Sequence, residues 1–174
     1  GMGNMFDGCS GLTTLDLRSF NTENVRVMKD MFGFCESLTS LDLSGFNTSN
    51  VIDMLAMFGG CKSLKSIDLS SFNTSNVKDL VGMFAGCESL ESLDLSGFNT
   101  SNMTSMRLMF QDCKSLQSLD LIHFNTTRVK DMQEMFMGCN HLGSIYVGKG
   151  WNTDSVTNST NMFMDCTSLV GEQG

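Results

Sequence analysis

Five aspartates recur at intervals of 26 residues, and each stands between two aliphatic residues. They are Asp16, Asp42, Asp68, Asp94 and Asp120. Side chains in a strand alternate between its two faces, so an aspartate between two inward aliphatic residues projects outward. If the repeats stack like neighbouring strands, the carboxylates form a column with a spacing of roughly 5 Å. Carboxylate oxygens are ligands that Ca²⁺ prefers, so this column is a candidate cation site.

A bound cation is one of two ways to offset the mutual repulsion of such a column. Two carboxylates roughly 5 Å apart repel by about 1 kcal/mol in water and by about 3 kcal/mol at an effective dielectric of about 20. The other way is hydrogen bonding from nearby hydroxyls, such as those of Ser44 and Ser70. One carboxylate per repeat is a small ligand set, and the sequence contains no known calcium-loop spacing. Hydrogen bonding is therefore the simpler interpretation.

Seven cysteines recur with almost the same interval: Cys9, Cys35, Cys61, Cys87, Cys113, Cys139 and Cys166. Zinc sites use closely spaced ligands, whereas these cysteines are far apart and the only histidines are His123 and His141. Stacked equivalents would point in parallel, which does not suit a disulfide, and an odd number cannot pair completely. We therefore expect buried free thiols that act as small apolar residues. No cofactor is expected.

The same period runs through the whole chain and predicts its organisation. Met-Phe pairs recur from Met5-Phe6 to Met162-Phe163, and Phe-Asn-Thr triplets recur from Phe20 to Phe124, with a variant at Trp151. A fixed period of this length is typical of a solenoid, in which each repeat packs on its neighbours. We expect one repeat array over residues 1–174, with about six repeats of 26 residues, partial end coils and an atypical last repeat at 140–166.

Each repeat contains patterns typical of two short elements. In residues 38–61, Leu41 and Leu43 flank an aspartate, as expected for a strand with one buried face. The apolar residues between Val51 and Phe58 follow helical spacing and predict a short α- or 3₁₀-helix. Neither element can bury its apolar side alone, but stacked coils cover one another.

The predicted fold is an α/β solenoid, a right-handed superhelix like that of leucine-rich repeats. A narrow parallel β-sheet would form one face and short α- or 3₁₀-helices the other. The repeat length of 26 residues lies within the leucine-rich-repeat range of about 20–29. A parallel β-helix is the alternative, and it is less consistent with a Val-x-x-Met-x-x-Met-Phe segment that lacks period-two alternation.

Three further columns follow from the stacking. The phenylalanines of the Phe-Asn-Thr triplets, such as Phe72, should form a continuous aromatic column. The asparagines that follow them, such as Asn73, should point inward and satisfy loop backbone groups. Charges alternate in sign just after the cysteines, at Glu36, Lys62, Glu88 and Lys114. Exposed ion pairs contribute only about 0–1 kcal/mol each, so this last column is interpreted as a way to avoid stacked like charges.

Charge and motif content exclude several function classes. The net charge is −8 and no basic stripe is present, which argues against a nucleic-acid partner. No apolar run approaches the ~18–20 residues of a membrane span, so no membrane insertion by this segment is expected. The sequence contains no nucleophile elbow, no phosphate loop and no histidine beside a candidate nucleophile. The sequence therefore predicts a protein that is not an enzyme.

The phrase SLxSLDLSxFNTSNVxxMxxMFxxC resembles the repeat of BspA-like leucine-rich-repeat surface proteins, which also occurs in mycoplasma lipoproteins. The resemblance covers nearly the whole chain and includes several fixed positions per repeat. It implies an extracellular location on a bacterial cell surface and adhesion to an extracellular protein or glycan of a host, matrix or neighbouring cell. It carries no catalytic residues. A rigid spacer that presents another domain is the alternative.

The last repeat departs from the pattern at a place where a ligand could meet it. Ile145-Tyr146-Val147 replaces Leu-Asp-Leu, and Gly148-Lys149-Gly150 adds one residue. Binding hot spots favour Trp, Tyr and Arg, whereas the regular outward face offers mostly Asp, Ser, Thr and Gly. The ligand-binding candidates are Ile122, His123, Tyr146, Lys149 and Trp151. The alternative is a distorted cap in which Trp151 takes the place of a phenylalanine.

Both ends of the chain interrupt the repeat pattern, and Gly1-Met2 falls in the middle of a repeat. We therefore expect a fragment of a longer array. An apolar end coil exposed at each end would favour end-to-end self-association.

Overall fold

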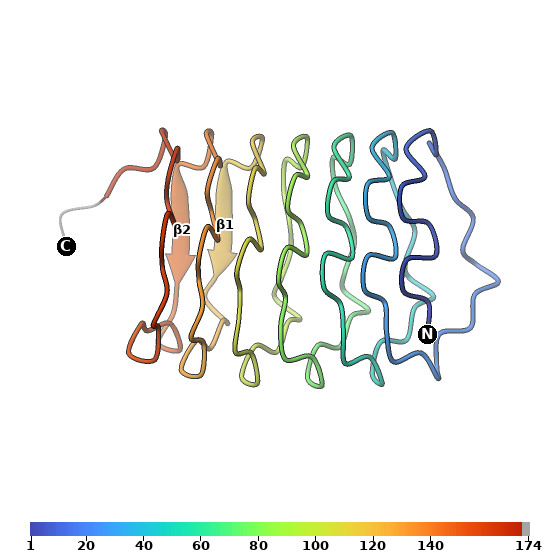
Figure 1. Ribbon diagram of the computed structural model, residues 1–174, viewed down its shortest axis with the longest axis horizontal. Helices are drawn as coiled ribbons and strands as arrows, with labels where there is room; N and C mark the ends of the chain where they lie inside the picture. The colour runs from blue at the N-terminus through green and yellow to red at the C-terminus, as the bar shows by residue number, and fades with distance from the viewer. Residues whose placement is uncertain (172–174) are drawn as a thin grey trace.

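The computed structural model describes residues 1–171, which form a stack of coils lying side by side along the long axis (Figure 1). Backbone hydrogen bonds join equivalent places in successive coils. The amide of Phe32 donates to the carbonyl of Met57 at 3.0 Å, and the amide of Phe58 donates to the carbonyl of Met83 at 3.0 Å. This stacking of repeats agrees with the predicted solenoid.

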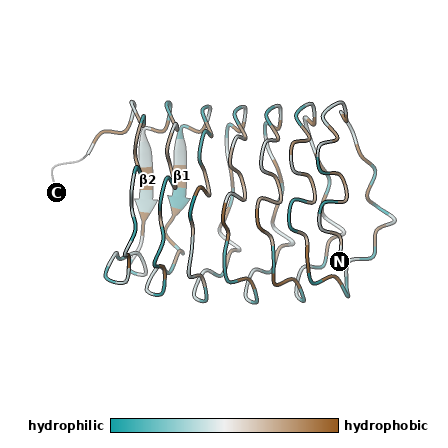
Figure 2. Ribbon diagram, in the orientation of Figure 1, coloured by the Kyte–Doolittle hydropathy of each residue, from teal (hydrophilic) through white to brown (hydrophobic). Residues whose placement is uncertain are grey.

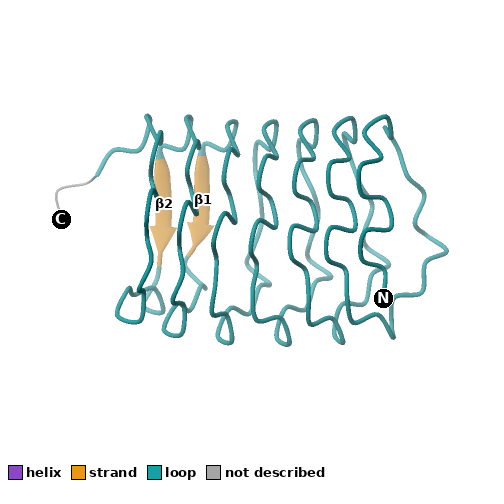
Figure 3. Cartoon of the chain, in the orientation of Figure 1, coloured by secondary structure: helices purple, strands orange, loops and turns teal. Residues whose placement is uncertain are grey.

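One side of the stack contains a regular sheet, and only near its C-terminal end. Strand β1 (Ser118–Leu121) pairs in parallel with β2 (Ser144–Val147), the two orange arrows of Figure 3. Elsewhere in residues 1–171, the Leu-Asp-Leu segments form no backbone hydrogen bonds with one another. The narrow parallel sheet predicted along the whole array is therefore present as two strands.

The predicted helices are wrong. Residues 1–171 contain no helix, and the Val-x-x-Met-x-x-Met-Phe segments form consecutive turns (Figure 3). The amide of Met31 donates to the carbonyl of Met28 at 3.1 Å, and the amide of Cys35 donates to the carbonyl of Phe32 at 3.2 Å. The part of the chain that the structure describes consequently includes no helix long and apolar enough to cross a membrane.

Backbone conformation explains why these segments are not helical. Asp30 and Phe34 have positive φ angles of 50° and 54°, whereas every residue of an α-helix has a negative φ. The amides of Asp30 and Phe32 therefore point out of the segment, and they donate to the next coil, at Leu55 and Met57, over 2.8 and 3.0 Å. Hydrogen bonds between coils take the place of those within a helix.

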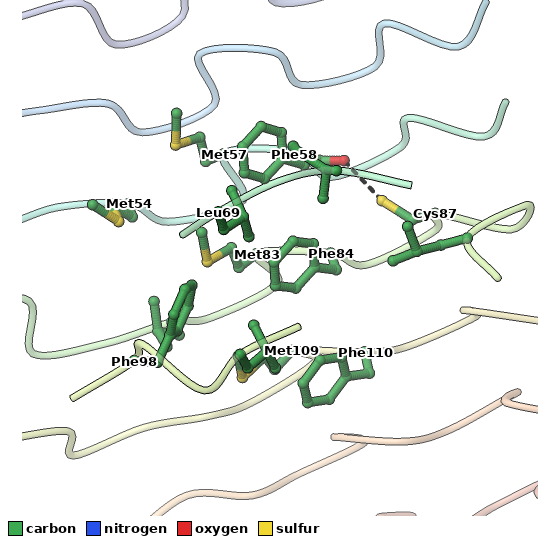
Figure 4. Close-up of a cluster of buried hydrophobic side chains, with 14 of the residues drawn as sticks. Met54, Met57, Phe58, Leu69, Met83, Phe84, Cys87, Phe98, Met109 and Phe110 are labelled. Carbon is green, nitrogen blue, oxygen red and sulfur yellow. Dashed lines mark hydrogen bonds between the residues drawn. The ribbon is translucent and has the colours of Figure 1, made fainter. Parts of the chain in front are cut away.

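The core is built from columns that run down the stack. Rings of the Met-Phe pairs, including Phe58, Phe84 and Phe110 in Figure 4, stack with centroids 5.4–6.0 Å apart and planes within 9° of parallel. Phe72 is buried, but the continuous stack runs through the Met-Phe pairs and not through the triplet phenylalanines. Hydrophobic and hydrophilic residues alternate along each coil in Figure 2.

Threonines, and not asparagines, form the buried polar column. Thr48 is buried, and its hydroxyl donates to the carbonyl of Asn73 at 3.2 Å while accepting from the amide of Asn73 at 2.7 Å. The side chain of Asn73 is exposed and accepts from the amide of Ser75 at 3.0 Å. The asparagines do satisfy loop amides, as predicted, but they do so from the exposed side, so the predicted inward position is wrong. The buried position belongs to the threonine hydroxyl, which can both donate and accept.

Candidate binding surface

The aspartate column lies on the exposed side of the coils, and each carboxylate has hydrogen-bond donors two residues further on. Asp42 accepts from the amide and the hydroxyl of Ser44, at 3.0 and 2.7 Å. Asp68 accepts from the amide of Ser70 at 2.9 Å. Equivalent amide bonds reach Asp16, Asp94 and Asp120. Each aspartate of the column therefore accepts a hydrogen bond from within its own coil.

These hydrogen bonds act on the charge of the carboxylates. The Ser44 hydroxyl and amide hold the pKa of Asp42 below its ordinary value, and the Ser70 amide does the same for the pKa of Asp68. Within residues 1–171, no three His, Cys, Asp or Glu side chains gather in a way that could hold a metal ion. The geometry requires no cation, and the cation column stays a prediction.

The cysteines are structural. The thiol of Cys61 contacts the carbonyl oxygen of Phe32 at 3.2 Å, and that of Cys87 contacts Phe58 at 3.2 Å, the dashed line of Figure 4. All seven are free thiols; Cys9 is exposed and Cys166 half-buried, but the other five are buried. Burial raises the pKa of the Cys87 thiol to about 12, so this group stays protonated and inert at neutral pH.

Two of the candidate ligand-binding residues are exposed in neighbouring coils, Tyr146 in β2 and Ile122 in the turn after β1. The register places Tyr146 opposite Asp120, so a tyrosine occupies the next place in the aspartate column. Ile122 follows Asp120 by two residues, and its amide donates to the Asp120 carboxylate at 3.0 Å. Tyr146 and Ile122 have exposed fractions of 55% and 47%.

The other three candidates differ in their exposure and in the hollows that they line. His123 is exposed and lines a small hollow of about 60 Å³ together with Asp94 and Asp120. Lys149 is exposed in the turn after β2. Trp151 is half-buried and packs against the core, so it takes the place of a triplet phenylalanine. Tyr146 and Trp151 contribute to the lining of one pocket, whereas His123 lines a separate hollow.

A pocket that the candidate residues did not define lies at the C-terminal end of the described coils. It has a volume of about 610 Å³ and is lined by Ile145, Trp151, Phe163 and Val170, among others. Phe163 continues the stacked column of rings but is 47% exposed, because no further described coil covers it. The signal in the sequence was the continuation of the core pattern into the last residues.

Comparison with known proteins shows that the chain matches a protein family. Residues 1–69 and 60–173 both match the family described as "Mycoplasma protein of unknown function, DUF285". The chain belongs to this family. Because the two matches together cover almost all of the described coils, DUF285 membership confirms the resemblance to the repeat found in mycoplasma proteins.

Among solved structures, the DUF285 array is similar to a leucine-rich repeat protein from Eubacterium ventriosum, with 16% sequence identity and a TM-score of 0.44. The similarity covers 79% of this chain and 42% of that protein, so the array spans less than half of its length. None of the curated proteins compared with the chain matches it significantly.

Proposed function

We propose that this array is a non-catalytic module of the bacterial cell surface that binds an extracellular protein. The observation that carries the proposal is the exposure of two large apolar side chains in neighbouring coils, Tyr146 in β2 and Ile122 in the turn after β1. Tyrosine is among the residue types enriched in binding hot spots. Its ring gives a partner an apolar anchor beside the aliphatic Ile122, and its hydroxyl is available for a hydrogen bond.

Polar side chains near Tyr146 and Ile122 would orient a bound partner. Earlier places in the outward column carry aspartates, and the column ends with Asp120 beside Tyr146. A protein partner can bury the Tyr146 ring while the Asp120 carboxylate and the exposed His123 orient its polar groups. Aliphatic surface such as that of Ile122 matches the apolar side chains of a protein better than the hydroxyls of a glycan.

The proposed location rests on the resemblance of the repeat to BspA-like surface proteins and on membership of a Mycoplasma family. A rigid spacer is the remaining alternative. It predicts that no ligand meets the outward face and that no exposed substitution there changes binding.

A capture experiment tests the proposal. The immobilised array is offered host-matrix proteins and, separately, purified glycans. Tyr146→Ala and Ile122→Ser should each weaken protein capture by about tenfold or more, while the melting temperature stays close to that of the wild type. Asp68→Asn is the matched control in the same outward column. Unchanged capture by both variants, capture of glycans alone, or no capture at all would each contradict the proposal.

A further inference from the structure

A second apolar surface lies on the side of the coils that the consecutive turns form, away from β1 and β2. It is a groove of about 380 Å³ that extends from the coil of Phe34 to the coil of Leu108. Leu55 and Val81 line it, and most of its other lining residues are glycine and alanine. We call this surface the turn-face groove. Its small residues leave backbone accessible to close approach by another chain.

Phe34 lies at one end of the turn-face groove, and both its exposure and its backbone conformation are unfavourable. Its side chain is 58% exposed, and its φ of 54° is disfavoured for a bulky residue. The equivalent residues of the neighbouring coils are Gly8 and Gly60, which adopt such angles without strain. A phenylalanine here therefore costs stability through both its conformation and its exposure. Strained residues of this kind cluster at sites of binding.

The column of alternating charges runs along the same coils. Lys62 lines the groove, and its ammonium lies 2.9 Å from the carboxylate of Glu36. Lys114 and Glu88 form the equivalent pair at 2.9 Å. From the N-terminal coil onward, the column reads acid, base, acid, base. In the opposite direction it reads base, acid, base, acid. Two copies of the column placed antiparallel and face to face therefore set every acid opposite a base.

We propose that the turn-face groove is a self-association surface whose occupant is a second copy of this chain, related by a two-fold axis. The axis lies in the surface, perpendicular to the stack, between the coils of Lys62 and Glu88. It places Lys62 of one copy opposite Glu88 of the other and each Phe34 ring opposite the coil of Leu108 and Asp112, with Asp112 at the position equivalent to Phe34. Such a contact is the same patch on both copies, so it closes at the dimer.

The two-fold axis also defines where the contact stops. Asp53 and Asp79 come two residues before Leu55 and Val81, and the axis exchanges their two coils. Extending the contact to them would bring like charges together, which is unfavourable. The interface therefore lies on the Lys62 side of Leu55 and Val81. This surface is separate from the outward face around Tyr146, so either can bind without the other.

Charge reversal in a sedimentation equilibrium experiment tests this arrangement. Wild-type protein should show a monomer–dimer equilibrium, and Lys62→Glu and Glu88→Lys should each raise the dissociation constant by about tenfold or more. An equimolar mixture of the two variants should recover the wild-type constant, because each reversed charge then meets its complement. Lys65→Glu is exposed, lies outside the groove and makes the same charge change, so it should leave the constant unchanged.

Phe34→Gly separates association from folding. Glycine accepts the positive φ, so this variant should melt at a higher temperature and yet dimerise more weakly. Three results would overturn the proposal: a monomer up to millimolar concentration, a dimer that all these variants leave intact, or open-ended growth into larger oligomers. The last result would indicate end-to-end association in place of a closed dimer.

Discussion

The hydroxyl of Thr74 donates to the carbonyl of Asn99 at 3.0 Å and accepts from the amide of the same residue at 2.9 Å. One buried side chain thereby satisfies both backbone groups of a residue in the next coil. The same exchange recurs from coil to coil, at Thr22, Thr48 and Thr100. The threonine column is therefore a polar seam that fixes the register of the stack from inside the protein.

Removing the hydroxyl should destabilise the array without changing its packing. Thr74→Val keeps the shape of the side chain but removes the partner that the amide and carbonyl of Asn99 share in a partly buried position. We expect the free energy of unfolding to fall by about 1–3 kcal/mol, measured by urea denaturation. Ser75→Ala removes a half-buried hydroxyl one residue away that bonds the exposed Asn73 side chain and no backbone group, so it should have little effect. Equal effects of the two substitutions would contradict the buried seam.

Much of the stacking could be predicted from the sequence, because a fixed period leaves few ways to bury one apolar side of every repeat. The outward position of Tyr146 followed from the alternation of the strand, and the buried thiols followed from spacing that suits neither zinc nor a disulfide. In each case a single geometric constraint was enough.

The turn segments could not be predicted, because a helix and a series of consecutive turns would bury the same residues in the core. Met28, Met31 and Phe32 reach the core from consecutive turns just as they would from one face of a helix. What separates the two structures is the positive φ at places such as Asp30, and these places often carry ordinary residues instead of glycine. The turn-face groove was hidden for the same reason, since its lining depends on how the turns are arranged.

Whether a glycine substitution raises or lowers the free energy of unfolding distinguishes a turn from a helix. Ala56 has a φ of 47°, and Gly82 occupies the equivalent place in the next coil with a φ of 62°. Ala56→Gly should therefore stabilise the protein by about 1 kcal/mol, whereas in a helix it would destabilise it by about that amount. Gly82→Ala, for which the structure has room, should do the reverse. Chemical denaturation at a concentration below that of any self-association measures both.

The buried thiols make the stability sensitive to alkaline pH. Burial raises the pKa of the Cys87 thiol from its ordinary value of 9.0 to about 12, so folding favours the protonated form. This contribution is complete below pH 9.0 and is lost as the pH rises toward about 12. Unfolding curves should show stability falling in that range, and Cys87→Ala should make the fall shallower than in the wild type. A profile that Cys87→Ala leaves unchanged would contradict this assignment.

Calcium should have little effect on the fold, because the aspartates of the outward column already accept hydrogen bonds from their own coils. We expect the melting temperature to be the same in calcium and in a chelator. Calorimetry should likewise show no saturable binding. Saturable calcium binding that Asp68→Asn weakens would restore the cation interpretation of the column.

The central claim is that a protein partner meets the array at Tyr146, and cross-linking from that position tests it most directly. A photoreactive side chain is placed at Tyr146 in one preparation and at Asp68 in another, and both are exposed to host-matrix proteins. We expect a specific covalent adduct from Tyr146 and none from Asp68. Equal adducts from both positions, or no adduct from Tyr146, would contradict it.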